Sequence, residues 1–128
     1  MKFRQLSVFL ENSPGHLKRV CSILASAGIN IRTLTIAESK SFGVMRAIVD
    51  RPEEAVSALE KEGVASKLVD VLSVEVADRP GALLEILEKA EAAGLNIEYM
   101  YAMTKGECAN PIMIMRFSDV DAAERLMG

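Results

Sequence analysis

The sequence Asn-Ser-Pro-Gly-His-Leu at residues 12–17 returns as Asp-Arg-Pro-Gly-Ala-Leu at residues 78–83, which is 66 positions further along the chain. The same offset carries Ala-Gly-Ile-Asn-Ile at residues 27–31 onto Ala-Gly-Leu-Asn-Ile at residues 93–97. It also aligns a run of alternating apolar residues before each Pro-Gly pair. Separated blocks in one register indicate an internal repeat, and a repeat sets the organisation of the whole fold. The sequence therefore predicts two copies of one supersecondary unit.

Each block of the repeat predicts an element of secondary structure. Leu6, Val8 and Leu10 have the period of two that a strand with one buried face requires. Residues 14–27 have apolar side chains at helical spacing, with a Pro suited to the first helical position and a Gly following the last. Asn12 is placed to close a turn onto the free amides behind it. The first copy thus begins with a strand and a helix.

The remaining elements follow the same logic in both copies. In the first copy, strands are predicted over residues 31–38 and 44–50, with a helix that opens at Pro52 and closes at Gly63. In the second copy, strands are predicted over residues 71–77, 97–104 and 111–117, with helices over residues 80–93 and 119–127. This order predicts an α+β fold of two tandem ferredoxin-like βαββαβ units, with antiparallel sheets and helices on one face.

The junction between the copies has no turn signal. Residues 64–77 contain no Gly, Pro or Asn, so we expect one long strand that serves both copies. We assign residues 1–68 to the first domain and residues 69–128 to the second. The second copy then reaches residue 128 at the close of its helix, so we expect it to lack a fourth strand. A missing strand predicts an exposed sheet edge, which another strand or chain tends to cover.

Composition narrows the possible classes of function. The chain has 128 residues, of which 50% are hydrophobic and 26% charged, as expected for a packed core. Its net charge is -3 and its 15 Lys and Arg residues are scattered, so no basic patch predicts nucleic-acid or membrane binding. No run approaches the roughly 18 apolar residues of a membrane span. Cys21 and Cys108 have no paired spacing and are expected to be free thiols. We expect a cytoplasmic protein.

No set of residues predicts catalysis or metal binding. His16 is the only histidine, so neither a His-based metal cluster nor a catalytic triad can be assembled around it. There is no glycine-rich phosphate loop and no nucleophile elbow. We therefore predict a protein that is not an enzyme and that uses no metal and no cofactor.

The two Pro-Gly motifs, each followed by a helix and then by Gly-Ile-Asn-Ile or Gly-Leu-Asn-Ile, resemble the ACT domain. The resemblance covers nearly the whole chain. Residues 96–101, Asn-Ile-Glu-Tyr-Met-Tyr, look like a subgroup of small bacterial proteins made almost entirely of two ACT domains. The resemblance implies a regulatory module that binds an amino acid at the first strand-to-helix loop and the adjoining second strand, often across an interface between ACT units. Asn12 departs from the family pattern, in which Asp is commoner at this position.

The implied ligand site falls on the two loops and on the strands after the helices. Free amides at the helix starts suit a ligand carboxylate, and Asp78 or Asn12 suits its ammonium. The second copy is preferred, because Asp78 carries a full charge where Asn12 offers a dipole. The candidate residues are Asn12, Pro14, Gly15, His16, Leu17, Asn30 and Ile31 in the first copy, and Asp78, Arg79, Pro80, Gly81, Ala82, Leu83, Asn96, Ile97, Tyr99 and Met100 in the second.

Other interpretations of the same residues stay open. Turns of this kind are common in loops that bind nothing. Strand parity predicts that Met100 faces the helices while Tyr99 and Tyr101 face away, toward a ligand or a partner surface. The alternative function is a protein-interaction regulatory subunit of a metabolic enzyme, without a small-molecule ligand. Both functions predict self-association, and we expect a homodimer. Only an amino-acid sensor predicts ligand-dependent stability.

Overall fold

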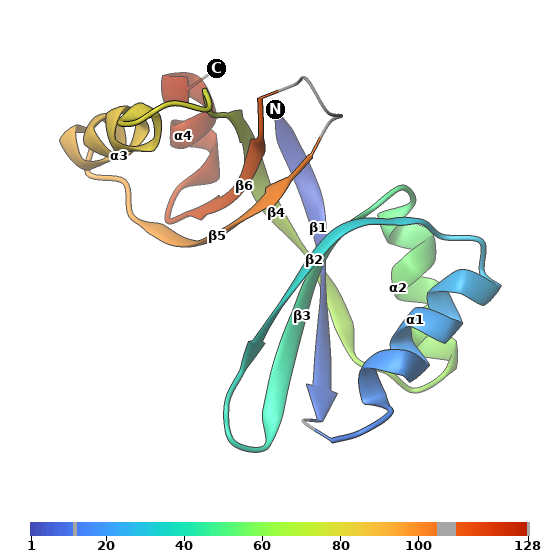
Figure 1. Ribbon diagram of the computed structural model, residues 1–128. Helices are drawn as coiled ribbons and strands as arrows, with labels where there is room; N and C mark the ends of the chain where they lie inside the picture. Colours follow the sequence, from blue (N-terminus) through green and yellow to red (C-terminus); the bar gives the residue numbers. More distant parts are fainter. Residues whose placement is uncertain (12, 105–109, 128) are drawn as a thin grey trace. The chain divides into compact units, whose positions relative to one another are not determined.

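The structure, a computed structural model, describes residues 1–11, 13–104 and 110–127 (Figure 1). Asn12 and Cys108, both named in the sequence predictions, lie outside the described residues. The chain divides into two compact units. The first unit is Arg4–Val69, and the second unit is Met1–Phe3 together with Asp70–Gly128. The elements are β1 (Lys2–Glu11), α1 (His16–Ser26), β2 (Ile31–Glu38), β3 (Phe42–Val49), α2 (Pro52–Lys61), β4 (Ser66–Glu75), α3 (Ala82–Ala92), β5 (Ile97–Met103), β6 (Ile112–Phe117) and α4 (Val120–Met127).

The first unit is a four-stranded antiparallel sheet with the strand order β2-β3-β1-β4. β3 pairs with β1 and with β2, and on the other side of β1 the Phe9 N–H donates to the Ala65 carbonyl at 3.0 Å. Leu6 lies opposite Ala47 in the β1–β3 register. The buried core combines one sheet face with both helices, and its residues are Leu6, Val8, Leu10, Met45, Ala47 and Val49 from the strands, Val20 and Leu24 from α1, and Ala55 and Leu59 from α2. Both helices thus pack on one face, as predicted.

The second unit repeats this architecture with the strand order β1-β4-β6-β5. β6 pairs antiparallel with β4 and with β5. Its buried core again joins one sheet face to two helices, and it consists of Leu72, Met115 and Phe117 from the strands with Ala90, Val120 and Ala123. The predicted fold class, two tandem ferredoxin-like βαββαβ units, is therefore confirmed.

The fourth strand position of the second unit is taken by Met1–Phe3, the first residues of the chain. The Ser73 N–H donates to the Met1 carbonyl at 2.8 Å, and Lys2 Nζ lies 2.9 Å from Asp121 Oδ1 on α4. The sequence places no strand there, because the segment precedes the first copy instead of following the second. Pairing requires only an extended segment with its backbone groups beside β4. β1 and β4 each contribute residues to both units, and β4 is the single long strand predicted across the junction.

The helices α1 and α3 begin two residues later than predicted. α1 begins at His16 and α3 at Ala82, so the prediction that Pro14 and Pro80 occupy the first helical position is wrong. Each proline lies instead in a turn that precedes the helix. Pro52 does open α2, as the sequence predicts. No helix in the described part of the chain is long and apolar enough to cross a membrane.

Candidate functional site

The turn before α1 is closed by two backbone hydrogen bonds. The Ser13 N–H donates to the Glu11 carbonyl at 2.9 Å, and the His16 N–H donates to the Ser13 carbonyl at 3.4 Å. Gly15 has φ 89° and ψ -14°. These are the values of the third residue in a type II turn, a position that favours Gly, while Pro14 occupies the second position, which favours Pro. The Pro-Gly pair therefore specifies a type II β-turn that precedes the helix, and it is not part of the helix itself.

The turn before α3 repeats this geometry. The Arg79 N–H donates to the Ala77 carbonyl at 3.0 Å, and the Ala82 N–H donates to the Arg79 carbonyl at 3.3 Å. Gly81 has φ 84° and ψ -7°, and Pro80 precedes it. The two copies of the repeat thus form the same type II turn at the same place.

Both turns lead into helices that no described side chain caps. The first helical hydrogen bonds run from the Arg19 N–H to the Gly15 carbonyl at 2.9 Å and from the Glu85 N–H to the Gly81 carbonyl at 3.1 Å. The amides of the two residues before each donor find no acceptor among the described residues. Amides of this kind, at the positive end of the helix dipole, suit a carboxylate.

The charges at the two helix starts differ. Arg19 in the first copy corresponds to Glu85 in the second at the repeat offset. Arg19 Nη2 donates to the Glu62 carbonyl at 2.6 Å, and no carboxylate within the described residues forms an ion pair with Arg19. Glu85 accepts two hydrogen bonds from Arg79 Nη2, at 3.0 and 2.9 Å. These hydrogen bonds, and then the charge of Arg79, lower the pKa of the Glu85 carboxyl and raise that of Arg79. The first helix start is cationic, and the second carries a compensated pair.

A pocket of about 260 Å³ lies beside the first turn. Three segments of the first unit form it: the end of β1, the start of α1, and the residues before β4. Its lining residues are Phe9, Leu10, Glu11, His16, Arg19, Val20, Gly63, Val64 and Ala65. His16 Nε2 lies 3.5 Å from Glu11 Oε2. The pocket thus brings the side chains of Glu11 and Arg19 together with an apolar wall at the start of α1.

The predicted site residues lie at both ends of the helices. Gly15 and His16 lie at the start of α1, whereas Asn30 follows its end, and an 11-residue helix is about 16 Å long. The Asn30 N–H donates to Asp50 Oδ1 at 3.0 Å. The Asn96 N–H donates to Ser118 Oγ at 3.1 Å, in the same place in the second unit. The backbones of these asparagines hold the starts of β2 and β5, and within one unit they do not meet the Pro-Gly turn.

The predicted residues on β2 and β5 divide between the two sheet faces. Ile31, Ile97 and Met100 pack against the cores of their units. Tyr99 lies on the other face and is half-buried. The predicted parity of Met100 and Tyr99 is therefore confirmed, while their part in ligand binding stays a prediction.

At the second turn, the Asp78 side chain is exposed. Its carboxylate has no hydrogen bond or ion pair with any residue in the described ranges. Ala82 is buried, and Leu83 is 36% exposed. The corresponding residue of the first turn, Asn12, lies outside the described residues.

Glu11 and Arg19 are not among the residues predicted from the sequence. Arg19 could have been found from the sequence, because the repeat places Glu85, of opposite charge, at the matching position of the second copy. Glu11 and the residues before β4 carry no such signal, because only the fold brings them to the turn. Among the described residues, no group of three His, Cys, Asp or Glu side chains is placed to hold a metal ion. Cys21 is a free thiol.

The chain consists of two ferredoxin-like units, and each has a type II Pro-Gly turn before its first helix. This arrangement defines a tandem pair of repeated domains. This chain belongs to the ACT domain pair family, whose model matches residues 1–127. It is therefore a regulatory module made of two ACT domains, as the resemblance implied.

Curated relatives of the chain include small subunits of acetolactate synthase. The acetolactate synthase isozyme 3 small subunit of Escherichia coli (strain K12) is 36% identical over 96 residues, which cover 71% of this chain and 57% of that protein. The acetolactate synthase small subunit of Buchnera aphidicola subsp. Schizaphis graminum (strain Sg) is 40% identical over 73 residues, covering 56% of this chain and 45% of that protein. The chain spans about half the length of the curated relatives it matches.

Solved structures share the fold over nearly the whole chain. The crystal structure of protein BT0572 from Bacteroides thetaiotaomicron has a TM-score of 0.91 and 36% identity, and the match covers 98% of this chain and 86% of that one. The ligand-free regulatory subunit of aspartate kinase from Thermus thermophilus has a TM-score of 0.68 and 21% identity, with coverage of 99% and 93%. At 21% identity, the likeness to the aspartate kinase subunit shows a shared fold and nothing further.

Proposed function

We propose that this ACT pair is a non-catalytic sensor that binds a free amino acid at the turn before α1 and thereby changes the activity of a partner enzyme. The observation that carries this proposal is the pocket beside the first turn, which Glu11 and Arg19 line at the start of α1. A free amino acid carries one carboxylate and one ammonium, and this pocket offers a partner for each.

The chemistry of binding follows from the lining residues. The ligand carboxylate accepts hydrogen bonds from the Arg19 guanidinium, near the positive end of the α1 dipole, and the ammonium donates to Glu11. The ligand side chain lies against the apolar wall, which includes Val64. The volume of about 260 Å³ lies just below the range of about 300–1,000 Å³ typical of drug-sized ligands, as a smaller molecule requires.

The second turn is proposed as a weaker site for the same ligand. The Ala82 amide already donates to the Arg79 carbonyl, so within Gly81 to Leu83 the Leu83 amide suits the carboxylate, and Asp78 suits the ammonium. However, Glu85 stands where the first copy has Arg19, and the charge of Glu85 is compensated by Arg79. The carboxylate therefore gains no cation there.

The partner proposed for the sensor is a catalytic subunit of a metabolic enzyme in the cytoplasm. Support comes from the curated relatives, which are small subunits of acetolactate synthase. A ligand regulates such an enzyme only if its affinity differs between the active and inactive states of the assembly. Amino-acid binding at the turn before α1 and association with the enzyme are then linked reciprocally.

Thermal and calorimetric titration with each of the twenty amino acids tests the proposal. A ligand at 100 times its dissociation constant stabilises the folded protein by about 2.7 kcal/mol. We expect such stabilisation for at least one amino acid, together with binding heat. Arg19→Gln should reduce both, and its melting temperature without ligand serves as the control for folding.

The second candidate function is an interaction subunit without a small-molecule ligand. It is favoured by exposed apolar side chains in the first unit, since Phe42 is 65% and Phe9 47% exposed. If none of the twenty amino acids produces heat or stabilisation, this second function replaces the sensor. Both functions predict the homodimer expected from the sequence.

A further inference from the structure

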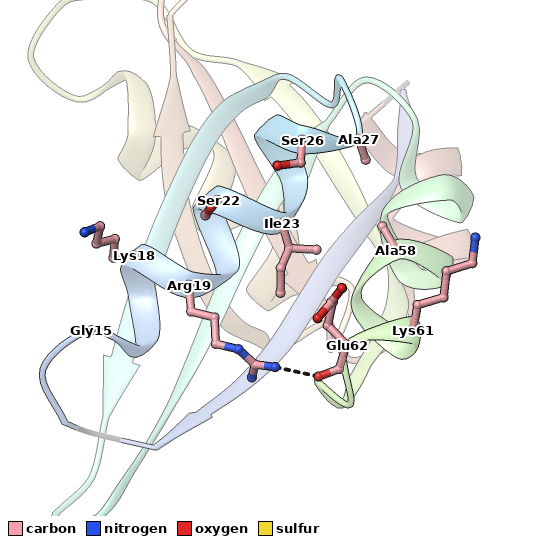
Figure 2. A pocket seen from close by; sticks show the side chains of 10 residues that line it. All are labelled: Gly15, Lys18, Arg19, Ser22, Ile23, Ser26, Ala27, Ala58, Lys61 and Glu62. Atoms are coloured by element: carbon pink, nitrogen blue, oxygen red, sulfur yellow. Dashed lines mark hydrogen bonds between the residues drawn. The ribbon is translucent and has the colours of Figure 1, made fainter.

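The two helices of the first unit enclose an open groove of about 720 Å³ (Figure 2). Ile23 on α1 and Ala58 on α2 contribute apolar surface to it. Its charged lining consists of three cations and one carboxylate, namely Lys18 and Arg19 on α1, Lys61 on α2 and Glu62 directly after α2 (Figure 2). Arg19 is hydrogen-bonded to the backbone at the end of α2, so the cations gather where α1 begins and α2 ends. The groove is therefore cationic at this end and has small side chains toward the other.

The corresponding helix of the second unit carries the opposite character. Leu84, Leu87, Glu88 and Glu91 on α3 have the spacing of one continuous helix ridge, and all four are exposed. Leu84 is 57% and Leu87 is 36% exposed. At the repeat offset, Leu84 corresponds to Lys18 of the first copy. The two copies therefore keep the same helix and present unlike surfaces on it.

We infer that the α3 ridge of one copy of this chain docks in the α1–α2 groove of a second copy. In this contact Glu88 and Glu91 meet the cationic end of the groove, and Leu84 lies toward Ala58 and the small residues at the other end. The orientation sets α3 antiparallel to α1 and parallel to α2, and it places the two carboxylates near the positive end of the α1 dipole. Each helix has 11 residues, about 16 Å, so α3 and α1 have the same length, and the ridge from Leu84 to Glu91 spans about 10 Å of α3.

Charge complementarity is the reason to assign a second copy as the occupant. The groove has Lys18 and Lys61 with no carboxylate bonded to either among the described residues. The ridge has two carboxylates beside two leucines that are exposed to water. Docking pairs the charges and removes the leucines from water in one step. The groove shares Arg19 with the proposed amino-acid pocket, whereas Lys18 and Lys61 line the groove and not that pocket.

Sedimentation velocity of the full chain at micromolar concentration tests the inference with two matched double variants. Lys18→Glu with Lys61→Glu reverses the groove, and Glu88→Lys with Glu91→Lys reverses the ridge. Each variant alone should weaken self-association by about a hundredfold, since like charges across an interface cost several kcal/mol. An equimolar mixture of the two should restore association, because each variant then meets a partner with the complementary charge.

Circular dichroism and melting temperature show whether the variants are folded. Leu84→Ser, which changes no charge, should weaken the same association and supplies a second test. The inference is overturned if the wild-type protein sediments as a single chain, or if the folded variants associate like the wild type. It is also overturned if the mixture fails to associate. In the first two cases the groove is free to receive another protein.

Discussion

The turns before α1 and α3 have the same backbone and different charges. Each has Pro in the second position and Gly in the third position of a type II turn, and each leads into a helix without a side-chain cap in the described chain. One turn after the start of the helix, the first copy has Arg19 and the second has Glu85. The repeat has thus kept what the backbone requires and changed what a ligand would meet. The copies share a fold, and under the proposed function they differ in affinity for the ligand.

The largest expected effect separates the two turns by ligand affinity. Arg19→Gln should lower the affinity for the amino acid about tenfold to a hundredfold, because a hydrogen bond to a charged group contributes about 1.5–3 kcal/mol. Glu85→Gln, the matched change in the second copy, should leave the affinity nearly unchanged. Isothermal titration calorimetry measures both.

Asp78→Ala tests the contrary result, that the ligand binds at the second turn and not at the first. If this change abolishes binding while Arg19→Gln leaves it intact, the ligand occupies the second turn, as the sequence alone predicts. If Asp78 only shapes the turn, Asp78→Ala lowers stability equally with and without ligand.

The next largest effect concerns stability, and it tests whether the backbones of the two turns are equivalent. Gly15→Ala and Gly81→Ala should each destabilise the fold by about 1–2 kcal/mol, because an L-residue pays this cost in the left-handed conformation. A Cβ atom at either position meets no atom within 4 Å, so the cost comes from φ alone and should be equal. Urea unfolding measures it. Costs that differ by more than the error of the two unfolding curves would show that the turns are not equivalent.

The smallest effect concerns the charge pair that only the second turn has. Arg79→Ala should raise the pKa of Glu85 toward its ordinary value, because it removes the hydrogen bonds and the charge that lower it. Since the folded-state pKa of Glu85 is lowered, the pair stabilises the fold above the ordinary carboxyl range. This contribution is lost as the pH falls through the lowered pKa. NMR titration of the Glu85 side chain follows the change, and an unchanged midpoint would contradict the pairing.

The fold was largely predictable from the sequence, because the repeat aligns the two copies and each element found in one copy supports the same element in the other. The alternation of Leu6, Val8 and Leu10 identifies a strand, and the absence of turn residues over 64–77 identifies the single long strand β4. The starts of α1 and α3 were predicted two residues too early, because Pro favours both the first position of a helix and the second position of a turn. Only the φ of the following Gly distinguishes them.

The candidate site was less predictable than the fold. The loop residues Gly15 and His16 follow from the motif, whereas Val64 comes to the pocket from a distant segment with no motif of its own. The fourth strand of the second unit was missed for the same reason. Hydrogen bonding between backbones leaves no pattern in the side chains when a three-residue segment pairs with a strand some seventy positions away.

The division of β1 between the two units has a consequence for how this protein can be taken apart. Its first residues complete the sheet of the second unit, while the rest of the strand belongs to the first. A gene cut between residues 68 and 69 therefore does not yield two whole domains. The C-terminal product would expose the backbone of β4 along the positions that Met1–Phe3 occupy, and such an open edge recruits other chains. A division that respects the sheet instead moves residues 1–3 to a position after α4, so that the second domain carries its own last strand.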